Sequence, residues 1–165
     1  MAMVCAFNVI HAFDVRPFVH LSTNMWFRPC WRMNRVQTNL VQQTFDHLNL
    51  FSTFDFRFSQ NATNTLCFGS YNITGRTQTT DRFGQLSSAN IYLHANITYA
   101  PQLSMAIIGH ELLHSIGMEH SLKPGWMNLH LFMENATKLI QELPYFWGLS
   151  LDDQRGLIYC FLRHT

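Results

Sequence analysis

The stretch His110-Glu111-Leu112-Leu113-His114-Ser115-Ile116-Gly117-Met118-Glu119-His120 decides the expected fold and the expected site. It has the form H-E-x-x-H-x-x-G-x-x-H. His110 and His114 are four residues apart, so on a helix they lie on one face about one turn apart. Gly117 is expected to end that helix, because glycine accepts the left-handed backbone conformation found at helix C-termini. The chain can then turn and bring His120 to the same point from outside the helix.

This order of groups predicts one catalytic zinc ion. Imidazole nitrogens are common zinc ligands, and three protein ligands leave a fourth position open for water. Glu111 lies one residue round the helix from His110, an offset that suits contact with the metal-bound water rather than the metal. A single histidine, or a bare H-E-x-x-H, is more often an ordinary core or surface feature. The third histidine beyond a glycine favours the metal site.

From these residues the chain resembles the metzincin metalloproteases, in which the long zinc motif is followed by a turn that contains a methionine. Met127 lies seven residues after His120, in the stretch Pro124-Gly125-Trp126-Met127, and Pro-Gly is a strong turn signal. The resemblance implies that Met127 forms a hydrophobic base under the metal.

Two further features resemble the matrixin branch, the relatives of the matrix metalloproteases. Ser121 follows the third histidine directly, and the stretch Leu149–Tyr159 is similar to the last helix of a matrixin catalytic domain. Ser150 is a good N-cap with Asp153 three residues on, and Asp152 and Asp153 suit the positive end of a helix dipole. Helix-start chemistry alone explains these residues. The resemblance adds that the aspartate pair ties this helix to the floor of the active site.

Other positions depart from the matrixin pattern. Met127 is followed by Asn128-Leu129-His130-Leu131, without the proline and tyrosine that form one wall of the specificity pocket in that family. Trp126 stands where small residues are common. Only 10 acidic residues are present, so few remain to build oxygen-ligand cages for calcium. We therefore expect calcium to be absent or minor.

Residue patterns predict an α+β fold. The resemblance implies a zincin architecture, with a twisted mixed sheet of about five strands, an antiparallel edge strand, the active-site helix, the methionine turn and a C-terminal helix. Strands are expected at Val15–Leu21, Phe54–Phe58, Thr65–Tyr71 and Ala89–His94, with polar Gly75–Gly84 as a loop or sheet edge. Helices are expected at Asn34–Leu50, at about Gln102–Ile116 after Pro101, and after Ser150.

Composition limits the classes of partner. With 165 residues the chain fits a single domain, residues 1–165, and 47% hydrophobic residues can supply a core. A net charge of +1 argues against a nucleic-acid-binding surface. No apolar run reaches the length of a transmembrane helix. We expect a monomer whose partner is an extended peptide or protein substrate, docked by strand addition at the sheet edge.

Sequons and cysteines indicate a secreted protein. Sequons begin at Asn61, Asn72, Asn96 and Asn135, and each alone is weak because Asn and Thr are common here. The even set Cys5, Cys30, Cys67 and Cys160 allows three pairings. Residues 1–15 are expected to be a weak signal or a disordered leader, since a basic start and a small-residue cleavage site are missing. An intracellular peptidase with unused sequons is the alternative.

Cys30 has two interpretations. Arg28-Pro29-Cys30-Trp31 faintly resembles the propeptide motif whose cysteine blocks the zinc in matrixins, but the residues that follow do not match. A structural cysteine or a disulfide partner is the favoured interpretation.

The expected function is zinc-dependent hydrolysis of peptide bonds. His110, His114 and His120 would hold zinc, and Glu111 would act as the general base and later return the proton to the leaving amine. The alternative is a zinc-stabilised, secreted binding module that has kept the fold without catalysis. Degenerate proteases usually lose the glutamate or a histidine first, and all of these residues are present.

Overall fold

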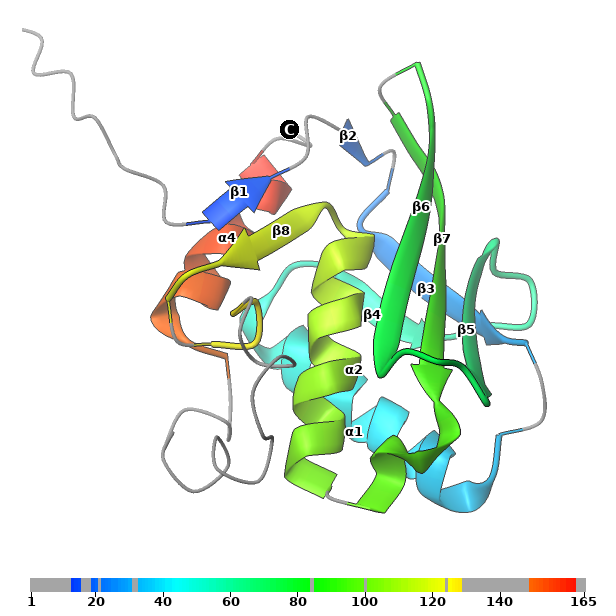
Figure 1. The fold of residues 1–165 in the computed structure, drawn as a ribbon. Helices are drawn as coiled ribbons and strands as arrows, with labels where there is room; N and C mark the ends of the chain where they lie inside the picture. The colour runs from blue at the N-terminus through cyan, green and yellow to red at the C-terminus, as the bar shows by residue number, and fades with distance from the viewer. Residues whose placement is uncertain are drawn as a thin grey trace, which may run out of the picture.

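The computed structural model describes residues 13–15, 19–20, 22–30, 33–83, 85–99, 101–123, 125–128 and 149–162. Figure 1 shows the arrangement of the elements. In chain order they are β1 (Phe13–Val15), β2 (Val19–His20), β3 (Asn24–Pro29), α1 (Arg35–Phe51), β4 (Asp55–Phe58), β5 (Asn64–Gly69), β6 (Gly75–Arg82), β7 (Gln85–His94), the 3-10 helix η1 (Ala95–Tyr99), α2 (Pro101–Ser115), β8 (Met118–Ser121) and α4 (Leu151–Leu162).

A mixed sheet forms the centre of the fold. Strands β4, β3, β5 and β7 are neighbours in that order and run parallel, and β6 pairs antiparallel with β7. Among the described residues the sheet has six strands when the two-residue β2, which pairs parallel with β7, is included. Together with the helices this confirms an α+β fold with a mixed sheet and an antiparallel edge strand. The stretch Gly75–Gly84, expected to be a loop or sheet edge, contains that edge strand, β6 (Gly75–Arg82).

Both long helices cover one face of the sheet. Asn34 caps α1, and its side chain and that of Gln37 form a reciprocal capping box. Phe45 of α1 packs on Phe27 of β3 and Phe56 of β4, with ring centroids 6.0 and 6.4 Å apart. Residues 106–108, 112 and 113 of α2 join the same buried cluster. Helix α2 also lies beside β6, so the edge strand and the histidine-bearing helix are neighbours.

Most expected elements lie within a few residues of their predicted positions, but the first strand was placed wrongly. The apolar run Val15–Leu21 holds parts of two short strands in different sheets, since β1 pairs with β8 and β2 pairs with β7. The strand directly before α1 in the main sheet is β3. It was missed because only two side chains of this short strand, Met25 and Phe27, are buried, while its other residues include asparagine, arginine and proline.

The length and hydropathy of a helix decide whether it can span a membrane. Across the segments that the structure describes, no helix is long and apolar enough to span a bilayer.

Candidate metal centre

Three histidines meet at one point. His110 and His114 lie one turn apart on α2, and His120 is on β8, the strand that follows Gly117. Gly117 has a φ of 93°, the left-handed conformation expected of a glycine that ends a helix. The Nε2 atom of His114 is 3.0 Å from that of His110 and 3.2 Å from that of His120, and the third separation is 3.2 Å. The sequence prediction that these three residues lie together is confirmed.

Backbone carbonyls orient two of the three rings. The Nδ1 atom of His110 lies 2.5 Å from the carbonyl oxygen of Trp126, and Nδ1 of His114 lies 2.6 Å from that of Met118. A carbonyl only accepts, so each Nδ1 carries the proton and each Nε2 presents a lone pair. This is the usual outer contact of a metal-bound histidine, where the second nitrogen donates to a carbonyl or carboxylate.

The donor set fits a small cation that prefers nitrogen. In a tetrahedral zinc site with Zn–N bonds of about 2.0–2.1 Å, two ligand nitrogens are separated by about 3.3–3.4 Å. The observed 3.0–3.2 Å separations are close to that value. Lone pairs at such distances repel one another unless a cation binds them. The three histidines could therefore hold Zn²⁺.

Burial favours the neutral form of His110. Its side chain is buried, which lowers its pKa well below the usual value, and the nearby charge of His114 lowers it further. The carbonyl of Trp126 acts in the opposite direction. Only a neutral imidazole can bind a metal, and the lowered pKa keeps His110 in this neutral form at neutral pH. His120, in contrast, is exposed, which leaves the centre open on one side.

Glu111 is a buried carboxyl group with a shifted pKa. Its exposed fraction is 4%, and burial raises its pKa to about 7. The hydroxyl of Thr77 on β6 donates to Oε2 at 2.6 Å, which lowers the pKa and offsets part of the rise. A general base is most effective when its pKa lies near the working pH. The environment of Glu111 therefore suits proton transfer at neutral pH.

The turn after β8 is buried and contacts His110 through the carbonyl of Trp126. Trp126 and Met127 are both fully buried, and the backbone N–H of Ser121 donates to the carbonyl of Met127 at 2.7 Å. The methionine turn predicted from the sequence thus packs inside the protein, next to the residue whose carbonyl orients His110. Residues 129–131, where the proline and tyrosine of the matrixin pocket wall are missing, lie outside the described residues.

Two aspartates at the start of α4 hold that turn. Asp153 accepts from the backbone N–H groups of Trp126 at 2.8 Å and Met127 at 3.1 Å. Ser150 and Asp153 also form the predicted reciprocal cap, in which the N–H of each residue donates to the other's side chain. Burial raises the pKa of Asp153, and the hydrogen bonds from Trp126, Ser150 and Met127 oppose that rise.

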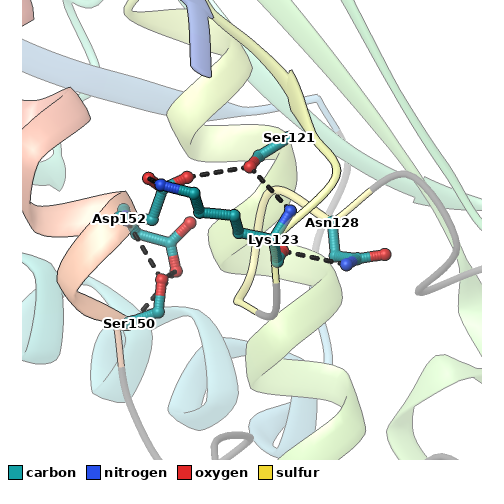
Figure 2. Close-up of polar contacts among 6 residues, drawn as sticks. Ser121, Lys123, Asn128, Ser150 and Asp152 are labelled. Atoms are coloured by element: carbon teal, nitrogen blue, oxygen red, sulfur yellow. Dashed lines mark hydrogen bonds and ion pairs between the residues drawn. The ribbon is translucent and has the colours of Figure 1, made fainter. Parts of the chain in front are cut away.

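Asp152 binds the other end of the turn, as Figure 2 shows. Its Oδ2 accepts from the hydroxyl of Ser121 at 2.8 Å, and its Oδ1 lies 3.4 Å from Nζ of Lys123. Asn128 closes the turn by donating to the carbonyl of Lys123 at 2.8 Å. The α4 aspartates therefore contact the segments on both sides of the turn, directly after His120 and around the carbonyl that orients His110.

A cavity lies along the first turns of α2. Its volume is about 470 Å³, and its walls come from the β5–β6 connection, from η1 and from the first turns of α2. Ile107, which lines it, is one turn before Glu111 on the same face of the helix. Glu111 and the three histidines are not among the residues that line this cavity, which therefore lies about one helical turn before the carboxyl group along α2.

Sequence reasoning missed several contacts that complete the site. Thr77 lies in a polar stretch that was expected only to be a loop or edge, and no motif spacing links it to Glu111 across 34 residues. The contact made by the Trp126 carbonyl has no sequence signal, because every residue has a backbone carbonyl. The tryptophan itself was the available signal, since it departs from the matrixin pattern.

Cys30 pairs with Cys67, and the Cα atoms of the two residues are 5.0 Å apart. The disulfide interpretation of Cys30 is confirmed. Cys160 is buried in the core cluster, and Cys5 lies outside the described residues.

Comparison of the sequence with known protein-family models finds no match, and comparison with curated proteins finds none either.

Proposed function

We propose that this protein is a zinc-dependent endopeptidase of the metzincin type, nearest in its motifs to the matrixins. The observation that carries the proposal is the convergence of three Nε2 atoms at 3.0–3.2 Å on a helix that also bears a buried carboxyl group with a pKa of about 7. Either feature alone occurs in non-catalytic proteins. Their combination on consecutive residues, His110 and Glu111, supports catalysis.

Residues of this chain have separate tasks in the proposed reaction. Bound zinc would lower the pKa of a coordinated water and polarise the scissile carbonyl. Glu111 accepts the proton of the attacking water and delivers it to the leaving amine. The Trp126 and Met118 carbonyls hold two ligands in the tautomer that presents Nε2. The Asp152 and Asp153 contacts fix the position of the turn that carries Trp126 relative to α2.

The edge strand offers a docking place for an extended peptide. Within the described part of the chain β6 pairs only with β7, so its second edge is open to an added strand. It lies beside α2, and Thr77 on it contacts Glu111. A peptide paired with β6 would run past the carboxyl group that removes the proton.

A secreted location is part of the proposal. The Cys30–Cys67 disulfide suits an oxidising compartment. The sequon residues Asn61, Asn72 and Asn96 are all exposed, so glycans could be attached there, whereas Asn135 lies outside the described residues.

The test compares the parent protein with Glu111→Gln, which keeps the size of the side chain and removes its basicity. Both proteins should bind zinc in a one-to-one ratio, and only the parent should cleave casein or a peptide library. A hydroxamate should stop the cleavage. Zinc binding without hydrolysis in the parent would favour the non-catalytic binding module, and equal cleavage by the Gln variant would refute the assigned base.

A further inference from the structure

The carboxyl group of Glu111 is held against the inward face of β6. The hydroxyl of Thr77 lies 2.6 Å from Oε2 and 2.8 Å from the backbone carbonyl of the same glutamate. A hydroxyl has one proton, and an ionised carboxylate is the stronger acceptor of the two. The backbone of Thr77 pairs with Ile91 in the middle of the β6–β7 ladder, so its position is fixed by the sheet. A β-branched side chain adds stiffness, because few χ1 rotamers are open to it.

Gly75 lies two residues earlier on the same face of β6 and leaves room for the other oxygen. A Cβ atom at this position would be 2.7 Å from Oε1 of Glu111 and 2.9 Å from its Cγ. Any side chain would therefore displace the carboxyl group. Gly75 and Thr77 together form a cradle in which one residue provides space and the other provides a donor.

We propose that Thr77 is the positioning residue of the general base, and that Gly75 completes its cradle. This inference rests on the proposed function, to which it adds the source of the base's orientation. With Oε2 bound to the hydroxyl, the carboxyl plane is fixed and Oε1 stays available for a water proton. A free glutamate would lose rotamer freedom at each turnover, and the cradle removes that cost beforehand.

The location of the cradle on β6 gives it a second consequence. The same strand offers its open edge to an extended peptide. A peptide that pairs with the β6 backbone is thereby aligned with the base through one rigid element. Strand β6 then holds both the scissile bond and the carboxyl group, which reduces misalignment between them.

The competing interpretation is that Thr77 only links β6 to α2 structurally, because its hydroxyl also reaches the backbone carbonyl of Glu111. The two interpretations differ in what the hydroxyl changes. A structural link affects stability and zinc content. A positioning residue affects the rate of the chemical step and the environment of the carboxylate, while the affinity for substrate stays the same.

The test uses Thr77→Val, which keeps the shape and removes the hydroxyl, with Thr77→Ser as the rescue. Thr80→Val is the matched control, since Thr80 is on the same strand but exposed. Thr77→Val should lower kcat about 10- to 100-fold, the usual effect of removing an outer-shell partner, with KM and zinc content unchanged. Thr77→Ser should restore most of kcat, and Thr80→Val should match the parent.

A second measurement does not depend on turnover. Isotope-edited infrared spectroscopy of the metal-free protein should reveal the carboxyl band of Glu111, identified by its loss in Glu111→Gln. That band should shift in Thr77→Val, return in Thr77→Ser and shift in Gly75→Ala, where the hydroxyl is intact. If the parent hydrolyses nothing, the proposed function fails, yet the infrared result still reports on the cradle.

Three outcomes would overturn the inference: an unchanged band and kcat in Thr77→Val, no recovery in Thr77→Ser, or a loss of zinc that parallels the loss of rate. If Thr77→Val does not fold, Gly75→Ala decides the question. The inference is upheld only if Gly75→Ala shifts the carboxyl band and lowers kcat while its zinc content is unchanged.

Discussion

Gly109 and Trp126 fit together so closely that a Cβ atom at position 109 would lie 2.1 Å from both Cε3 and Cζ3 of the indole ring. The ring thus packs on the helix backbone directly before His110. The carbonyl of the same tryptophan accepts from Nδ1 of His110 at 2.5 Å. One residue of the turn therefore contacts two consecutive residues of α2, and the absence of a Cβ atom at Gly109 explains how the tryptophan is accommodated.

We expect Gly109→Ala to destabilise the protein by about 1–3 kcal/mol or more, because an added methyl in a packed core forces neighbours apart. Trp126→Leu alone should also destabilise, since it leaves a cavity. In the double variant the leucine frees space for the new methyl. The double variant should therefore lose less unfolding free energy than the sum of the losses in the two single variants. Urea unfolding of all four proteins measures this coupling, and strictly additive losses would contradict the packing relationship.

The sequence predicted those parts of the fold in which one local pattern sets the structure. The cap of α4, the helix between Pro101 and Gly117 and the meeting of the histidines all depend on local spacings in the sequence. It failed for β3, where two buried side chains in six residues give little periodicity. Thr77, Gly75 and the Gly109–Trp126 contact depend on which elements become neighbours, and no local pattern encodes that.

Zinc binding should stabilise the folded protein. A ligand at 1,000 times its Kd adds about 4 kcal/mol, so a strong chelator should lower the Tm and added zinc should restore it. His120→Ala is the informative variant because His120 is exposed, so its loss should leave the metal-free Tm unchanged. The zinc-dependent rise should disappear in that variant. His94→Ala, a histidine outside the cluster, should keep it, and a rise of equal size in all three proteins would argue against the site.

Ser121 and Lys123 contact the same carboxylate but should differ in importance. The Ser121 hydroxyl is a buried donor to Asp152, and Ser121→Ala should cost about 1–3 kcal/mol because the carboxylate loses that partner. The Lys123 side chain is 53% exposed, so Lys123→Met should cost less than about 1 kcal/mol. Denaturant unfolding gives both values. A larger effect for Lys123→Met would mean that the ion pair, rather than the hydroxyl, holds the turn.

The disulfide should support stability without touching the metal centre. Cys30 and Cys67 are separated by 37 residues, and closing a loop of this size contributes roughly 3–4 kcal/mol through chain entropy. Leu66 and Phe68 point into the core, so Cys67 between them faces the opposite side of the sheet. A Cys30→Ser/Cys67→Ser protein should therefore unfold at lower denaturant yet bind zinc with the parent affinity. A matching loss of zinc affinity would show that the two regions are coupled.

Asp153 should make stability depend on pH in a direction unusual for an aspartate. Burial raises its folded-state pKa above the unfolded value of about 4, despite the opposing hydrogen bonds. The folded protein then holds the proton more tightly than the unfolded chain. The contribution of this group is fully present below about pH 4 and is lost as the pH rises through the folded-state pKa.

Asp153→Asn removes this titration and should be less stable than the parent, because both oxygens of the Asp153 carboxyl group accept hydrogen bonds and an amide has only one acceptor oxygen. The gap in unfolding free energy between the parent and the variant should be largest near pH 4, should narrow as the pH rises and should then level off. Other groups, including the neighbouring Asp152 and its partner Lys123, are present in both proteins and cancel in the difference. Urea unfolding in steps from pH 4 to 8 measures the gap, and a gap that widens with pH would mean that the hydrogen bonds from Trp126, Met127 and Ser150 outweigh burial.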